Sequence, residues 1–172
     1  MTTVLILSLV ILILSIIAHE VAHGYAANSL GDPTARLAGR LTINPLPHID
    51  PVGSVMIPAL LIFTSSPILF GWAKPVPYNP YNLRGRFSEA FVAVAGSLTN
   101  ILLAIIFALI VRFVPELPSS AQAVAVNISF INLFLGLFNL IPFPPLDGYT
   151  TLRALLPWNL TASWRRFEGG AS

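Results

Sequence analysis

Four apolar segments alternate with polar, proline-rich stretches along the chain. They span Thr3 to Ala27, Pro51 to Phe70, Phe87 to Phe113 and Ser119 to Ile141. The first, third and fourth are each long enough to cross the roughly 30 Å hydrocarbon core of a bilayer as a helix. The second is interrupted by Pro58 and Pro67, so an unbroken helix is not expected there.

Two shorter elements are expected between and after these segments. Alternating apolar and polar residues from Arg40 to Asn44 predict a short strand or hairpin. The sequence YTTLRALL, just after Asp147, predicts a short helix. The predicted fold class is an all-α membrane protein: a bundle of three core transmembrane helices, with a proline-broken second apolar segment and the short strand or hairpin element. Residues 1–157 form one predicted domain, and residues 158–172 form a polar C-terminal tail.

The composition indicates a membrane environment. Hydrophobic residues make up 55% of the 172 residues and charged residues only 9%, with a mean hydropathy of +0.79, whereas soluble domains carry about 25% charged residues. The nine Lys and Arg are too few and too scattered for a nucleic-acid surface, so no nucleic-acid partner is expected. The chain has no cysteine, which excludes disulfides and thiolate metal sites.

One polar cluster, the sequence AHEVAH at residues 18–23, lies near the end of the first apolar segment. His19 and His23 are four residues apart, so on a helix both imidazoles share one face and can reach one metal ion. Glu20 can reach a water molecule on that metal without being a ligand, as in the H-E-x-x-H pattern of zinc hydrolases. Because polar residues are costly at membrane depth, the cluster favours a function. The alternatives are packing near a helix end, or two histidines that hold a haem or a transported metal, which leaves Glu20 unexplained.

A catalytic zinc needs a third protein ligand, and the chain offers few. The remaining candidates are His48, Asp32, Asp50, Glu89, Glu116, Asp147 and Glu168. Asp147 is the best of these because prolines break the chain just before it, and broken backbone at membrane depth is tolerated where it lines a cavity. Asp147 also suits the N-cap of the following helix, and its spacing leaves both roles open. The competing functional hypothesis is a membrane protein that binds or transports a metal without cleaving peptides.

Three motifs, in this order, resemble a known family. HEVAH in the first apolar segment, AGSLTN in the third and NLIPFPPLDGY after the fourth resemble the site-2 protease family of intramembrane zinc metalloproteases, peptidase family M50. GRLTINPLPHIDPVGSVMIPA and FGWAKPVPYNP look like its small bacterial-type members without a PDZ or CBS module. The resemblance covers most of residues 15–157. It implies a zinc-dependent endopeptidase that hydrolyses peptide bonds in or near transmembrane segments of membrane proteins.

The resemblance also implies roles for individual residues. Carried onto this sequence, it implies one Zn2+ per chain, with His19, His23 and Asp147 as its ligands. It implies Glu20 as the catalytic glutamate. It also implies that Asn100 and Asn139 contact the substrate or a reaction intermediate. A helix–helix hydrogen bond is the alternative for each asparagine. The resemblance gives no firm role for His48.

Topology constrains the second apolar segment independently of the family. His19 and Asp147 both lie near the C-terminal ends of apolar segments, so they meet only if the first and fourth helices run parallel. Parallel helices need an odd number of crossings between them, so we expect the second segment to be re-entrant. Eight Lys and Arg then lie on one side and only Arg112 on the other, whereas four full crossings give six against three. By the positive-inside rule, the active site is expected to face the cytoplasm. The resemblance to bacterial-type members implies the cell membrane of a prokaryote, with the lipid bilayer and a transmembrane substrate as partners.

Overall fold

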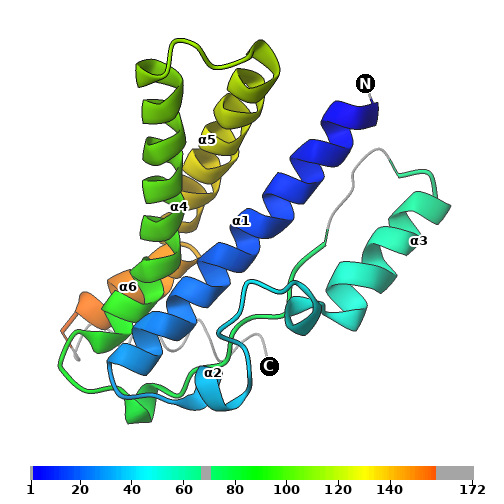
Figure 1. Cartoon of the computed structure of the whole chain (residues 1–172). Coiled ribbons are helices and arrows are strands. Elements are labelled where there is room, and N and C mark those ends of the chain that lie inside the picture. Colours follow the sequence, from blue (N-terminus) through cyan, green and yellow to red (C-terminus); the bar gives the residue numbers. More distant parts are fainter. Residues whose placement is uncertain (1, 67–70, 158–172) are drawn as a thin grey trace.

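A computed structural model describes residues 2–66 and 71–157 of the chain (Figure 1). In chain order its helices are α1 (Thr2–Ser29), α2 (Thr34–Leu37), the 3-10 helix η1 (Leu46–His48), the π-helical segment η2 (Pro51–Met56), α3 (Ile57–Phe63), the 3-10 helix η3 (Pro80–Asn82), α4 (Ser88–Phe113), α5 (Ser119–Asn139) and α6 (Asp147–Leu155). The described residues contain no strand, which agrees with an all-α fold class. The predicted tail, residues 158–172, lies outside the described residues.

Three helices are long and apolar enough to cross a membrane, as predicted. Their candidate spans are Ile6–Ser29 in α1, Ser88–Phe113 in α4 and Ser119–Asn139 in α5. Helix α4 packs against both α1 and α5. The chain runs in the same direction in α1 and α5 and in the opposite direction in α4 (Figure 1).

Hydrogen bonds between polar side chains show that α1 and α5 run parallel. Asn127 Nδ2 donates to Ser8 Oγ at 2.8 Å, and Asn132 Nδ2 donates to Ser15 Oγ at 2.9 Å. The partners therefore advance along both helices together. A parallel α1 and α5 is the arrangement that a site built from His19 and Asp147 requires.

The second apolar segment leaves the end of the bundle where α1 finishes and α4 begins, and it returns to that end (Figure 1). We call this end the base of the bundle. Trp72 N donates to Gly53 O at 3.1 Å, and Ser54 Oγ donates to Trp72 O at 2.8 Å. Nearby, Lys74 N donates to His48 O at 2.9 Å. Because the chain from His48 into η2 and the chain after α3 are joined by these bonds, both ends of the segment lie at one level (Figure 1). Pro67 and the end of the predicted apolar segment, residues 67–70, lie outside the described residues.

The strand or hairpin predicted for Arg40 to Asn44 is wrong. This stretch bends at residues 42 and 43, because short polar side chains form hydrogen bonds with its backbone. Asn44 N donates to Thr42 Oγ1, and Leu46 N donates to Asn44 Oδ1, both at 3.1 Å. His48 Nε2 lies 2.9 Å from Thr42 O, which closes the turn. Such local side-chain to backbone bonds compete with the hydrogen bonds of a strand.

A buried carboxylate ties the end of α1 to the loop that precedes α4. Asp32 has no exposed surface, and its oxygens accept from Thr34 N and Oγ1, Asn79 N and Asn82 Nδ2. Burial by itself raises the pKa of Asp32, but the hydrogen bonds from Thr34, Asn82 and Asn79 outweigh it and hold the pKa below the usual value. The ionised carboxylate therefore fixes residues 79–82 against the base of α1.

Candidate metal centre

The two histidines of the motif lie on one face of α1, inside its apolar span. His19 Nε2 and His23 Nε2 are 3.0 Å apart, and the two rings meet edge to face. His19 is buried, with 7% of its surface exposed. The α-helix brings the rings together because residues four apart stand one above the other on its surface.

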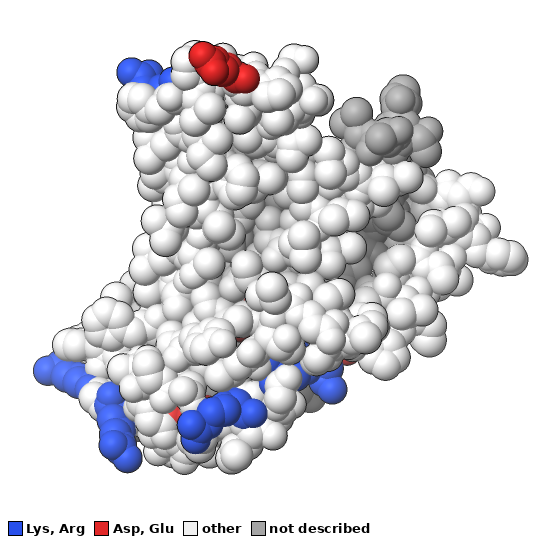
Figure 2. All heavy atoms as spheres, viewed as in Figure 1, with Lys and Arg blue, Asp and Glu red and all other residues white. Residues whose placement is uncertain are grey.

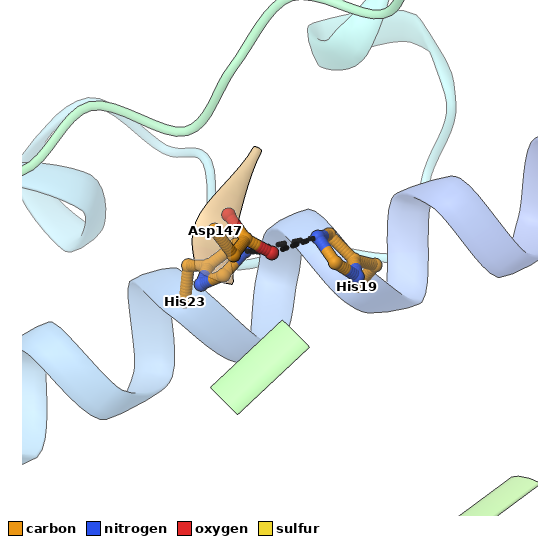
Figure 3. A group of neighbouring side chains, drawn as sticks. All are labelled: His19, His23 and Asp147. Carbon is orange, nitrogen blue, oxygen red and sulfur yellow. Dashed lines mark hydrogen bonds and ion pairs between the residues drawn. The ribbon is translucent and has the colours of Figure 1, made fainter. Parts of the chain in front are cut away.

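Asp147 reaches the same point from the other end of the chain. Its Oδ2 lies 2.9 Å from His19 Nε2 and 3.3 Å from His23 Nε2 (Figure 3). It is the first residue of α6, where Leu146 occupies the N-cap position, and no side chain caps this helix. The carboxylate thus faces the imidazoles. Burial by itself raises the pKa of Asp147, but the neighbouring imidazoles of His19 and His23 lower it to about 2.

A tight turn between α5 and α6 returns Asp147 to this position. Helix α6 packs against α4, and Arg153 Nη2 forms an ion pair with Glu89 Oε1 across that contact. The backbone at Gly148 lies against the carbonyl groups of Leu140 and Ile141, where a Cβ atom has no room. Glycine after Asp147 is therefore a packing requirement of the turn.

The three facing atoms suit a zinc ion in type and in spacing. Bonds of about 2.0–2.1 Å in a tetrahedral zinc site place neighbouring ligand atoms about 3.3 Å apart. The observed separations among His19 Nε2, His23 Nε2 and Asp147 Oδ2 are 2.9, 3.0 and 3.3 Å. His23 Nδ1 lies 2.7 Å from Val92 O; a carbonyl can only accept, so Nδ1 carries the proton and Nε2 keeps its lone pair for a metal. The donor set is that of a catalytic zinc site with one open position.

Sequence reasoning missed the glycine of α4 that makes room for this cluster. A Cβ atom on Gly96 would lie 2.5 Å from His23 Nε2 and 2.7 Å from His19 Nε2. The next residue, Ser97, places its Oγ 3.5 Å from Asp147 Oδ2. The motif AGSLTN contains Gly96, but the family resemblance implies a role only for its asparagine, Asn100.

Glu20 points to a different neighbour from the two histidines beside it. Its Oε2 accepts a hydrogen bond of 2.9 Å from the backbone N–H of Val76. Val76 belongs to the polar loop between α3 and α4, 56 residues further along the chain. The carboxylate of this residue, which follows His19 in the chain, is thus held by the main chain.

The remaining sequence-predicted residues take different positions. Asn100 is fully buried on α4, one turn beyond Gly96, and its Oδ1 and Nδ2 have no hydrogen-bond partner within the described part of the chain. Asn139 donates to Leu135 O at 3.0 Å, one turn back in α5. His48 is buried in the loop before η2, where its ring contacts Thr42 O, and it is not among the clustered ligand atoms.

Comparison with known proteins agrees with the geometry. YwhC of Bacillus subtilis, which carries the name "Putative zinc metalloprotease YwhC", is 38% identical over 167 residues, a match that covers 91% of this chain and 72% of YwhC. The chain belongs to the site-2 protease family of zinc metalloproteases. As a member of this family the protein is a zinc metalloendopeptidase that uses Zn2+, and its three long apolar helices make it an integral membrane protein.

Two less similar relatives are matched over a smaller share of their own length. Rip2 of Mycolicibacterium smegmatis is 27% identical over 81% of the chain, which spans 53% of Rip2. MJ0392 of Methanocaldococcus jannaschii is 24% identical over 86% of the chain, which spans 33% of MJ0392. Rip2 carries the name "Putative zinc metalloprotease", and MJ0392 carries the name "Zinc metalloprotease". No family model matches the chain, and no solved structure matches it.

Proposed function

We propose that this site-2 protease binds one zinc ion through His19, His23 and Asp147 and hydrolyses peptide bonds in or near transmembrane segments of membrane proteins. The observation that carries the proposal is the convergence of these three ligand atoms, at 2.9 to 3.3 Å from one another, within the apolar span of α1. Membrane-embedded polar groups of this cost need a function to retain them.

The chain supplies the proton transfers. A zinc ion held by His19, His23 and Asp147 would supply Lewis acidity, which polarises a carbonyl and makes water acidic near neutral pH. Glu20 then takes a proton from the attacking water and delivers it to the leaving amine. Asn100 is the better supported of the two substrate-contact candidates, because its buried amide keeps its hydrogen-bonding groups uncommitted within the described residues. Asn139 would have to give up its bond to Leu135 to serve the same purpose.

The proposed substrates are helical segments that unwind before they are cut. A transmembrane helix engages its carbonyl groups in i to i−4 hydrogen bonds, so a carbonyl becomes available only where the helix opens. Helix-breaking residues close to the scissile bond should therefore speed cleavage. The proposed partners are such a substrate and the surrounding bilayer, with no nucleic acid.

The charge distribution supports a cytoplasmic position for the site. Lys and Arg gather at the end of the molecule that holds α2 and α6 (Figure 2), while Arg112 lies in the last turn of α4 at the opposite end. Positive charge marks the cytoplasmic side of a membrane protein. We place the base of the bundle in the cytoplasm of a prokaryotic cell, and the segment from η2 through α3 as a re-entrant loop that enters from that side.

Cysteine labelling tests this topology cleanly because the chain has no cysteine of its own. On intact cells, a membrane-impermeant maleimide should label the Glu116→Cys variant. The Arg36→Cys variant should react only after the membrane is permeabilised. Outside labelling of Ser65→Cys, at the end of α3, would contradict a re-entrant loop, since that residue would then have crossed the membrane.

Zinc content and cleavage together test the function. The purified protein in detergent should hold one zinc per chain, Glu20→Gln should keep it, and Asp147→Ala should lose it or bind it weakly. In proteoliposomes with a single-span substrate, Glu20→Gln should abolish cleavage, while Glu116→Gln, the same change at an exposed site, should leave it intact. Cleavage by Glu20→Gln at the normal rate would favour a metal-binding or transport protein, and zinc binding indifferent to Asp147 would overturn the ligand set.

A further inference from the structure

An extended stretch of the loop after α3 lies along the half of α1 that carries the histidines. We call residues 74–79 the strap. Val76 N donates to Glu20 Oε2 at 2.9 Å near its middle, and Asn79 N donates to Asp32 Oδ2 at 2.7 Å at its end. The side chain of Val76 is buried, and it lies so close to Gly24 that a Cβ there would come within 2.8 Å of it. The strap is therefore held against α1 by backbone bonds and by packing.

Between residues 75 and 77 of the strap only one amide can serve Glu20. Pro75 and Pro77 flank Val76, and proline has no N–H group. Val76 therefore supplies the sole backbone donor in the sequence Pro75-Val76-Pro77. A hydrogen bond to an ionised carboxylate is stronger than one between neutral groups, so this single contact can fix the orientation of the Glu20 side chain.

The buried guanidinium of Arg40 binds the carbonyl side of the peptide group whose N–H is that of Val76. Arg40 has 6% of its surface exposed, and its Nη2 donates to Lys74 O at 2.6 Å and to Pro75 O at 3.2 Å. Pro75 O and Val76 N belong to one planar peptide group. The guanidinium thus binds the carbonyl of the group whose N–H binds Glu20. Hydrogen bonds aligned in this way polarise and strengthen one another.

The burial of Arg40 calls for a reason beyond the stability of the loop. Removing a guanidinium from water is costly unless the group is fully bonded, and its Nε is buried without a partner among the described residues. Its bonding partners are main-chain carbonyls of the strap. A less polar side chain would fill the space at lower cost, but it would leave the peptide between residues 75 and 76 free to rotate away from Glu20.

We propose that Arg40 is a positioning residue for the catalytic glutamate, acting through the peptide that joins Pro75 to Val76. It holds that peptide so that Val76 N–H binds Oε2 of Glu20, and the other oxygen, Oε1, is left to exchange protons with the reacting groups. The proposal rests on the proposed role of Glu20 as general base. It assigns to the strap the same task that a conserved orienting partner performs for other catalytic groups.

Substitution of Arg40 tests the proposal against a matched control. Arg40→Met keeps an unbranched stem but removes the guanidinium and its donors, and Arg36→Met removes an exposed cation four residues away. We expect Arg40→Met to lower kcat by about 10- to 100-fold, as for other losses of alignment at an active site, with KM within about 2-fold. Arg40→Lys, whose ammonium can still donate to a carbonyl, should recover part of kcat, and Arg36→Met should behave as the unmodified protein.

Zinc measurements separate positioning from damage to the fold. The zinc affinity of Arg40→Met, from competition with a chelator, and the visible spectrum of its cobalt-substituted form should match those of the unmodified protein. If Arg40→Met fails to fold, replacing Val76 with its α-hydroxy analogue removes the N–H donor to Glu20, weakens the Pro75 carbonyl as an acceptor for Arg40, and should lower kcat to a similar extent. Unchanged kcat in both variants overturns the proposal. Cleavage that survives Glu20→Gln overturns the proposed function instead, so the two failures are distinct.

Discussion

Gly96 offers the sharpest test of the metal centre, because one added methyl group would meet both imidazoles. In Gly96→Ala the new Cβ would lie 2.5 Å from His23 Nε2 and 2.7 Å from His19 Nε2. Ordinary contact begins near 3.4 Å, so the rings must withdraw by about 0.7 to 0.9 Å. Zinc–ligand distances tolerate only about 0.2 Å. Alanine also favours the helix by about 0.5–1 kcal/mol relative to glycine, so the cost should fall on the metal site rather than on α4.

We therefore expect Gly96→Ala to weaken zinc binding at least about 10-fold, within the range seen when partners of zinc ligands are altered. The assay is competition with a chromogenic chelator in detergent, with thermal unfolding measured alongside. Gly136→Ala is the matched control, since its Cβ would press on Ile101 of α4 at 2.8 Å, away from the imidazoles. It should lower stability and leave zinc affinity unchanged. Equal zinc affinity in Gly96→Ala and the unmodified protein would refute the reasoning.

Three further outcomes follow from the contacts described above. Asp32→Asn should lower the free energy of unfolding at pH 7 by about 1–3 kcal/mol, since an amide nitrogen would face a donor. Because folding lowers the pKa of Asp32, its stabilising contribution is present above the pKa of the unfolded state and is lost as the pH falls through the pKa of the folded state. Thermal unfolding at pH 7 and pH 3 should therefore show a smaller stability difference between Asp32→Asn and the unmodified protein at pH 3. Asn132→Ala removes a buried bond to Ser15 and should cost about 1 kcal/mol, more than Asn127→Ala at the half-exposed bond to Ser8, by thermal unfolding in one detergent. Chelation of zinc should abolish peptide cleavage and lower the unfolding temperature, and added zinc should restore both.

The spanning helices and the histidine pair were accessible to sequence reasoning because their signals are local. Apolar length gave α1, α4 and α5 to within a few residues, and helical periodicity placed His19 beside His23. Asp147 needed more, since its spacing fitted both a ligand and an N-cap. The parallel course of α1 and α5 is what brings its carboxylate to the imidazoles.

The features that escaped the sequence depend on contacts between distant segments. Alternation in Arg40 to Asn44 predicted a strand, but Thr42 and Asn44 bind their own backbone, and a pattern of apolar positions does not encode that competition. The partner of Glu20 is a main-chain amide, so no side chain at position 76 reveals it. Gly96 is informative only once α4 is known to lie against the histidines.

The position of the imidazoles on α1 has a consequence for which bonds can be cut. His19 lies 13 residues after Ile6 and 10 before Ser29 within the span Ile6–Ser29, or about 20 Å from one end and about 15 Å from the other at 1.5 Å per residue. For the proposed transmembrane substrates, only a narrow band of the substrate's length would lie at that level of the bilayer. The depth of the site would then select the bond that is cut, and moving a substrate's susceptible bond by one helical turn, about 5.4 Å, should carry it out of reach while the residues around it stay the same.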